Sequence, residues 1–397
     1  MPHKLIYLDN HATTRVDPRV LDAMMPYLTD HYGNASSFSH RYGLHAATAV
    51  AFSRERIAHA IGALPEEIIF TSGATESNNI AVLGVSSAYK KAGDHVITSC
   101  LEHSSVDEVF EALRRFGFSV TYAGHQRDGQ VEGNDILEAM SPRTAFVSLI
   151  HASNEIGTIN ELKTISEMCR HHGVPFHTDA SQSIGKIPIN VDELGVDLMS
   201  ISGHKLYGPK GVGALYIRSR RPRIHVDPVV FGGGQELRIR PGTLNVAGIV
   251  GLAEAIEVAL RDMDADRTQL RRRRNLLWDR LRSGVPGCLV NGPDPILFPD
   301  RRLDGNLNVW FPGIDGMLLL REAQIVAAST GSACSSTHGE PSRILRKLYT
   351  DPLRALQSIR FGVGRFTTDD DIDNAAEAII RSYQRLTSTR STSQGVS

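Results

Sequence analysis

The residues that could do chemistry begin with an acid and a lysine that follow two predicted strands. Residues 174–177 form a short apolar run just before Asp179, and residues 196–201 form another that leads to Lys205. In an α/β sheet, side chains at the carboxyl ends of neighbouring strands converge on the ligand crevice. A lysine that forms an imine with pyridoxal 5′-phosphate (PLP), with a carboxylate on the pyridinium nitrogen, fits this pair. A structural ion pair is an equally good explanation of these two residues alone.

Other polar residues at predicted strand ends weigh against that simpler explanation. The small-residue turn at 72–75 opens a helix, where backbone N–H groups and Thr75 could hold a phosphate or merely cap the helix. His103 could stack on an aromatic cofactor and move protons. The remaining candidates, which suit a phenolic oxygen or a phosphate, are Asn154, Gln182, Ser202 and His204. Each alone could be an ordinary hydrogen-bonded residue, but so many at strand ends favour one shared ligand site.

Size and composition place the chain among ordinary globular proteins. Its 397 residues are 41% hydrophobic and 22% charged, which suggests two domains with cores that need no disulfide or metal. The formal net charge of −1 gives no general attraction to nucleic acid or to a membrane surface. The four cysteines contain no C-x-x-C pair, so we predict free thiols, no metal site and a cytoplasmic location. The amino terminus has no targeting pattern, and no apolar run approaches the roughly 20 residues of a membrane span.

The elements that must position these residues alternate regularly along the first part of the chain. Apolar runs predict strands at 67–71, 95–99, 119–122, 145–150, 175–177, 196–201 and 211–217, and helical periodicity fills most of the intervals. Such alternation predicts an α/β fold with a mostly parallel sheet covered on both faces.

The character of the sequence changes near residue 258. A highly charged helix at 261–281 carries Arg271–Arg274, which we expect on a solvated surface, with an acidic partner as the alternative. Short strands and helices then predict a smaller α+β domain. We predict a large PLP-binding domain over residues 16–258, a small domain over 1–15 plus 259–386, and a disordered Ser/Thr-rich tail over 387–397.

The assembled motifs resemble those of the cysteine desulfurases of the long-loop class, which are fold-type I PLP enzymes of the class V aminotransferase superfamily. The matching stretches run in order from residue 7 to residue 367 and cover nearly the whole chain. They are YLDNHATT (7–14), YGNASS (32–37), TSGATESNN (71–79), EHSS (102–105), NEIGT (154–158), HTDASQ (177–182), SGHKLYGPKG (202–211), GTLN (242–245), GSACSS (331–336) and SIRFGVGRFT (358–367). The resemblance implies a seven-stranded sheet with a smaller α+β domain.

The resemblance also implies roles for the cofactor-binding residues. Lys205 would form the imine with PLP and move the Cα proton, Asp179 would pair with the pyridinium nitrogen, and His103 would stack on the ring. Gln182 would reach the phenolic oxygen. The phosphate would be held by Thr75, Ser202 and His204, with Thr243 added from the neighbouring subunit of a homodimer. Pro241 stands where the family usually has serine, and it removes a backbone donor beside Thr243.

On the substrate side, the resemblance implies that Arg360 grips the carboxylate of L-cysteine, and that Asn154 and Asn34 help to orient the molecule. Cys334 would accept the sulfur and pass it to a protein partner. Its neighbours at 328–340 are small and polar, so the composition itself predicts an exposed, mobile loop. Among the other cysteines, Cys100 and Cys169 are better explained by packing.

The predicted activity is conversion of L-cysteine to L-alanine with a persulfide on Cys334. Two alternatives stay open. One is another PLP reaction on the same scaffold, such as β-elimination from cysteine or selenocysteine, or transamination. The other is a docking subunit that retains PLP without turnover. The acceptor could belong to iron–sulfur assembly, tRNA thiolation or DNA sulfur modification.

Overall fold

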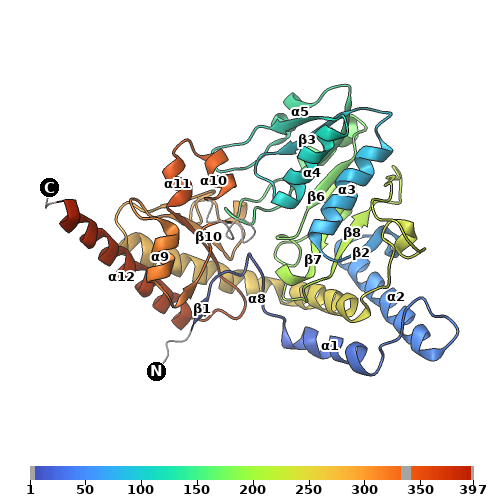
Figure 1. The fold of residues 1–397 in the computed structure, drawn as a ribbon, viewed down its shortest axis with the longest axis horizontal. Helices are drawn as coiled ribbons and strands as arrows, with labels where there is room; N and C mark the ends of the chain where they lie inside the picture. Colours follow the sequence, from blue (N-terminus) through green and yellow to red (C-terminus); the bar gives the residue numbers. More distant parts are fainter. Residues whose placement is uncertain (1–4, 332–340, 395–397) are drawn as a thin grey trace.

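The computed structural model describes residues 5–331 and 341–394, which form two domains joined by one long helix (Figure 1). The large domain contains a seven-stranded sheet with the order β2-β8-β7-β6-β5-β3-β4. Its strands are β2 (Ile68–Thr71), β3 (His95–Ser99), β4 (Ser119–Ala123), β5 (Thr144–Ile150), β6 (Phe176–Asp179), β7 (Leu198–Ser202) and β8 (Gly213–Ile217). Only β8 runs antiparallel to its neighbours, so the prediction of a mostly parallel α/β sheet is confirmed.

Helices cover both faces of this sheet, which is why its central strands are apolar on both sides. All seven residues of β5 are buried, as expected for a strand in the middle of a covered parallel sheet. The helices are α1 (Pro18–Thr29), α2 (Arg41–Ile61), α3 (Ala74–Ala88), α4 (Ser104–Arg115), α5 (Gly133–Ala139), α6 (Leu162–His171) and α7 (Val191–Leu194). One core lies between the sheet and α3 and α4, and a larger one lies between the sheet and α2, α6 and α8 (Val246–Gly284).

The 39-residue helix α8 connects the domains, and its two ends contribute to different cores. Residues up to Leu260 pack in the large domain, whereas Leu270, Leu277 and Trp278 pack in the small one. The apolar segment after Asn245 and the charged segment at 261–281 are therefore one helix, which Figure 1 shows running along the base of both domains.

The prediction that Arg271–Arg274 form a solvated surface is wrong for Arg274, which is completely buried. Its guanidinium donates to the carbonyl of Pro295 over 3.1 Å. The other three arginines form ion pairs with aspartates, as Arg271 does with Asp304 over 2.6 Å. The physical reason is the spacing: four consecutive residues point in all directions around a helix, so one of them faces the core.

The small domain is built on a three-stranded antiparallel sheet and a two-stranded parallel one. Its strands are β1 (Ile6–Tyr7), β9 (Leu289–Val290), β10 (Asn306–Trp310), β11 (Val326–Ala327) and β12 (Ser358–Gly362). Its helices are α9 (Gly316–Glu322), α10 (Arg343–Leu348), α11 (Pro352–Leu356) and α12 (Asp369–Gln394). Strand β1 pairs with β11, so the amino-terminal segment belongs to this domain.

Helix α12 continues to Gln394, so it extends into the segment 387–397 for which the sequence predicts disorder. The segment has almost no apolar residues, but it extends a helix whose earlier turns are packed, and adding residues to an existing helix is far easier than starting one. Among the described helices, none combines the length and apolar character needed to cross a bilayer.

Candidate functional site

The carboxyl ends of the central strands open onto a cavity of about 340 Å³. It lies where the sheet meets the small domain, and most of the predicted site residues line it. The predicted residues that the structure brings together there are Thr75, His103, Asn154, Asp179, Gln182, Ser202, His204, Lys205 and Arg360. The sequence motifs that contain them lie far apart in the chain, so their meeting depends on the sheet.

Strand register explains this convergence. Ile150, at the end of β5, pairs with Asp179 at the end of β6, and Asp179 pairs with Ser200 of β7. Strands β5 and β6 therefore end at the same level, and β7 continues slightly further, to Ser202. The turn after β7 is a short 3₁₀ segment that carries Lys205, so the lysine emerges one strand away from the acid.

Asp179 is held as an oriented carboxylate. Its Oδ1 accepts from the backbone N–H of Ser181 over 2.9 Å and from the Ser181 hydroxyl, and its Oδ2 accepts from Asn78 Nδ2 over 2.9 Å. Asn78 lies on the buried face of α3 and also contacts Ser105. The sequence motif at 71–79 contains Asn78, but reasoning from the sequence assigned it no role.

Lys205 donates from Nζ to the backbone carbonyls of His11 and Ala12, each over 2.7 Å. These residues follow β1, so the amino-terminal segment of the small domain reaches across to the lysine. His11 is 4% exposed and lines the cavity. It was not among the predicted site residues, although it belongs to the motif at 7–14.

The end of the cavity near α3 suits an anion. Helix α3 begins at Ala74, and its first-turn N–H groups carry the positive end of the helix dipole. A side chain on Gly213 of β8 would lie 2.7 Å from Gly73 Cα, so only glycine allows the strand to pass this turn. His204 Nδ1 forms a hydrogen bond with Thr13 Oγ1 over 3.1 Å. Burial and the nearby Lys205 lower the pKa of His204 to about 4, so its imidazole is neutral near pH 7.

His103 caps helix α4, since its Nδ1 accepts from the backbone N–H of Ser105 over 3.2 Å. Burial lowers the pKa of His103 below its ordinary value. Its neighbour Glu102 is completely buried and accepts from Ser99 Oγ over 2.7 Å and from the Ile150 N–H over 3.0 Å. Burial raises the pKa of Glu102 to about 8, so this carboxyl is neutral at pH 7.

Arg360 brings a buried cation to the opposite wall. It is 1% exposed, and its Nη2 binds Asp9 Oδ1 over 2.7 Å while its Nη1 donates to the Asn154 carbonyl over 3.2 Å. Within the described part of the chain, Arg360 Nε and Asn154 Oδ1 are buried without a hydrogen-bond partner. Buried polar groups are nearly always satisfied, so these atoms indicate a place for a polar ligand.

These side chains fit PLP. A fixed carboxylate, a lysine, a stacking imidazole and a helix start supply what the pyridinium nitrogen, aldehyde, ring and phosphate of PLP require. Asp179, Lys205 and His103 would hold the ring, and Thr75, Ser202 and His204 surround the anion end.

Two predicted residues, Asn34 and Thr243, do not line this cavity, and a third cannot be placed. Asn34 is exposed, and its Oδ1 accepts from the Ser36 N–H over 2.9 Å. Thr243 is also exposed and does not line the cavity of its own chain, so its predicted contact with a neighbouring subunit stays a prediction. Cys334 lies outside the described residues. Of the other thiols, Cys169 is completely buried in the core, as expected from its packing role.

Comparisons with known proteins agree with this site. Residues 6–375 match the family described as Aminotransferase class-V. The chain is 47% identical to a mitochondrial cysteine desulfurase of Drosophila melanogaster, over 96% of this chain and 81% of the relative. It is 46% identical to the cysteine desulfurase IscS of Salmonella schwarzengrund, over 96% and 93% of the two chains. A solved NifS-like protein superposes with a TM-score of 0.87 at 33% identity, covering 95% of this chain and 98% of that one. The chain therefore belongs to the class V aminotransferase family and, within it, to the PLP-dependent cysteine desulfurases.

Proposed function

We propose that the protein converts L-cysteine to L-alanine and transfers the released sulfur, through a persulfide on Cys334, to a protein acceptor. The observation that carries this proposal is that Arg360 and Asn154 line the same cavity as Lys205, and that Arg360 Nε and Asn154 Oδ1 are buried without a hydrogen-bond partner among the described residues. A buried guanidinium is suited to an amino-acid carboxylate, and an amide oxygen can accept from an ammonium or thiol group.

In this proposal different residues bind the substrate, hold the cofactor and transfer protons. Arg360 and Asn154 orient L-cysteine by its carboxylate, while Asp179 keeps the cofactor nitrogen protonated. PLP, when bound, withdraws electrons from Cα of the amino acid. Lys205 Nζ takes the Cα proton and later returns a proton to Cα, while the additional proton gained at Cβ balances the one that the Cys334 thiol loses. In the structure this amine donates to the His11 and Ala12 carbonyls, each over 2.7 Å, so two acceptors hold it beside the cavity.

The sulfur step uses Cys334 as nucleophile. Its Sγ bonds to the sulfur of L-cysteine, the Cβ–S bond of the substrate breaks, and Cβ gains the proton that completes the methyl group of L-alanine. The products are L-alanine and a Cys334 persulfide, so L-cysteine and the thiol account for all atoms. An acceptor thiol or similar nucleophile then removes the outer sulfur.

We further propose a homodimer in the cytoplasm, in which Thr243 of one subunit completes the phosphate site of the other. Large exposed aromatic side chains support this proposal, since Phe38 near α2 is 71% exposed and Phe231 is 83% exposed. The loop that carries Phe231 is fixed to α2 through an ion pair of Arg54 and Glu236.

The experiment exposes the PLP-loaded protein briefly to L-cysteine without reductant, then combines peptide mass spectrometry with an assay for alanine. We expect one added sulfur atom on the peptide that contains Cys334, together with alanine. Cys334→Ser should lose the added sulfur, and Cys100→Ser serves as a matched thiol control that keeps it. Pyruvate with an unmodified Cys334 would favour β-elimination, and bound PLP with no turnover would favour a docking subunit.

A further inference from the structure

Gln182 belongs to a hydrogen-bonded group that the catalytic assignments do not explain. Lys186 Nζ donates to Gln182 Oε1 over 2.9 Å, and His11 Nδ1 lies 3.0 Å from the same oxygen. Gln182 Nε2 in turn donates to the His11 carbonyl over 2.9 Å. Gln182 and His11 are 3% and 4% exposed, so water does not compete for these bonds.

The chemistry of the two neighbours determines which way the Gln182 amide faces. A backbone carbonyl only accepts, so the atom that faces the His11 carbonyl must be the amide nitrogen. The atom that faces Lys186 is then the amide oxygen, which accepts from Nζ. Reversing the amide would place a C=O against the His11 carbonyl and would remove the acceptor that faces Lys186.

The same group determines the tautomer of His11. Since Gln182 Oε1 is an acceptor, His11 Nδ1 must carry the proton in the 3.0 Å contact. Burial, with Lys186 second, lowers the pKa of His11 well below its ordinary value, so the imidazole is neutral. One lysine behind the cavity thus fixes both an amide and an imidazole at its wall.

We propose that Lys186 is a positioning residue, which together with His11 fixes the Gln182 amide so that an N–H faces the phenolic oxygen of PLP. Gln182 Nε2 has two hydrogens, and among the described residues only the His11 carbonyl accepts one of them. The second hydrogen remains for a ligand in the cavity that Gln182 lines. Gln182 Oε1, with two donors, is not available to that ligand.

The surroundings of Lys186 support this role. Burial, followed by repulsion from Lys205, lowers the pKa of Lys186 to about 7, and an uncharged amine still carries N–H donors for Gln182. The small cavity beside Lys186 is lined by further charged or titratable groups from four segments. They are His11 after β1, Tyr207 after β7, Asp266 and Arg267 on α8, and Asp304 before β10. Of these five, His11 is the one with a hydrogen bond to Gln182 Oε1 among the described contacts.

The consequence is a measurable property of the bound cofactor. An N–H that faces the phenolic oxygen stabilises negative charge on that atom, whereas a C=O in its place repels the charge. The loss of one hydrogen bond to a charged group should shift the pKa of the bound chromophore by about one unit or more. Lys186 should therefore lower the pH at which the visible absorbance band of bound PLP changes.

The experiment is a pH titration of that absorbance in PLP-loaded protein, without substrate. Lys186→Met should raise the apparent pKa of the bound chromophore by about one unit. Gln182→Leu should raise it by at least as much, and the double variant should show no further shift, because Lys186 acts through Gln182. Lys186→Arg, which keeps the donors, should restore most of the wild-type value. Lys163→Met, on the exposed face of α6, is the matched control for the loss of a lysine and should titrate like the wild type.

The inference about Lys186 rests on the assignment of Gln182 to the phenolic oxygen of PLP. The outcomes of the titration distinguish a failure of the one from a failure of the other. If Gln182→Leu shifts the titration and Lys186→Met does not, Lys186 has no positioning role. If the two shifts add in the double variant, Lys186 acts by its charge alone and the inference is overturned. If neither variant shifts the titration, the assignment of Gln182 to the phenolic oxygen fails as well, while the desulfurase activity is judged separately by the Cys334 persulfide.

Discussion

At the scale of the residue, the site depends on ionisable groups whose surroundings decide their charge. Arg360 forms an ion pair with Asp9 over 2.7 Å, and its Nε is buried without a partner in the described structure. Glu102, equally buried, has no cation among its described hydrogen-bond partners, and burial raises its pKa to about 8, which keeps it neutral at pH 7. Burial alone therefore does not determine charge, and the identity of the partner does.

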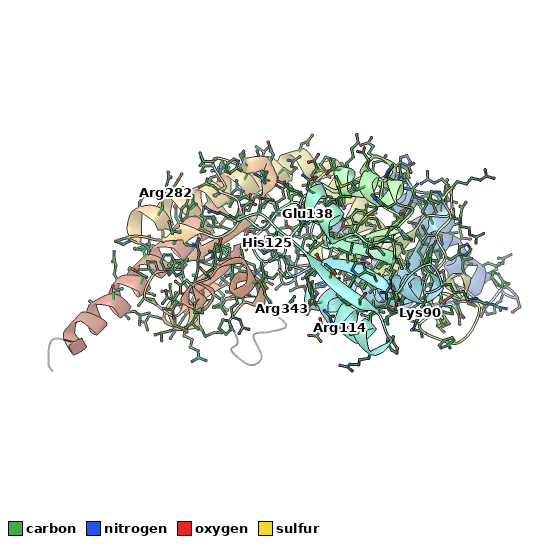
Figure 2. The ribbon with its side chains drawn as sticks, turned by 90° about the horizontal axis from the view of Figure 1, so that it is seen from above. Lys90, Arg114, His125, Glu138, Arg282 and Arg343 are labelled. Atoms are coloured by element: carbon green, nitrogen blue, oxygen red, sulfur yellow. The ribbon has the colours of Figure 1, made fainter. Side chains whose placement is uncertain are left out.

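Arg360→Lys should lower kcat/KM for L-cysteine by about 10- to 100-fold, because an ammonium group cannot form the paired bonds of a guanidinium with a carboxylate. The spectrum of bound PLP should be unchanged. Steady-state kinetics at full PLP occupancy measure the effect. Arg282→Lys is the control, since Arg282 is exposed on α8 and pairs only with Asp279 among the described residues (Figure 2). Equal losses in both variants would contradict the role of Arg360.

Glu102→Gln should make stability less dependent on pH. The unfolded carboxyl loses its proton near 4.5, whereas the folded one holds it up to about 8, so the free energy of unfolding falls as pH rises between these values. Glutamine keeps an oxygen for Ser99 and Ile150 and cannot ionise. Urea unfolding should show a gain from the substitution of about 1–3 kcal/mol at pH 8 and little at pH 5. A gain of the same size at both pH values would show that ionisation of Glu102 is not the cause.

At the scale of the element, β5 is an inner strand of the sheet that aligns the site. Phe146 on β5 is completely buried and stacks on Phe110 of α4 and on His177 of β6, with ring centroids 6.4 and 6.3 Å apart. These contacts join one helix to two neighbouring strands. The level at which β5 and β6 end, and therefore the position of Asp179, depends on this packing.

Phe146→Ala should lower the free energy of unfolding by about 3–5 kcal/mol, because the surrounding rings cannot close the resulting cavity. Urea denaturation of the PLP-loaded protein measures the loss. Phe116→Ala is the matched control, because Phe116 is 60% exposed and its removal should cost less than about 0.5 kcal/mol. A small loss at Phe146 would mean that β5 tolerates repacking and does not hold the sheet in register.

At the scale of the whole molecule, the cavity is assembled from both domains. Arg360 comes from β12 of the small domain and Lys205 from the large one, and helix α8 keeps the two in one body. Arg343 of α10 adds a second connection. Its guanidinium forms an ion pair with Asp107 of α4 and donates to the Glu102 carbonyl over 2.7 Å, and Figure 2 shows it between the two domains.

Mixed dimers test the proposed contribution of Thr243 across the subunit interface. A dimer of one Lys205→Ala chain and one Thr243→Ala chain should contain one intact site and keep about half of the wild-type activity. A dimer of one doubly substituted chain and one wild-type chain should bind PLP more weakly at its only lysine-bearing site. The reverse ranking would show that Thr243 acts within its own chain, and sedimentation should show dimers in every case.

The sequence by itself determined the fold class and most of the chemistry. Apolar runs at strand spacing are a local property, and they predicted the mostly parallel sheet at nearly the observed positions. Asp179 and Lys205 were predicted because they follow predicted strands, and Arg360 was predicted from the resemblance to the cysteine desulfurases. The cysteine desulfurase family was likewise indicated by motifs alone and is confirmed by the relatives.

Only the tertiary structure decided which residues act together. Three sets of contacts join segments that are separated by up to 351 residues, or by a turn whose shape no local pattern predicts. They are the contacts of Asn78 with Asp179, of Asp9 with Arg360, and of Lys186 and His11 with Gln182. It also placed Arg274 in a core and extended α12 to Gln394. The physical reason is that burial and hydrogen-bond partners depend on which segments pack together, whereas secondary structure depends largely on neighbours in the chain.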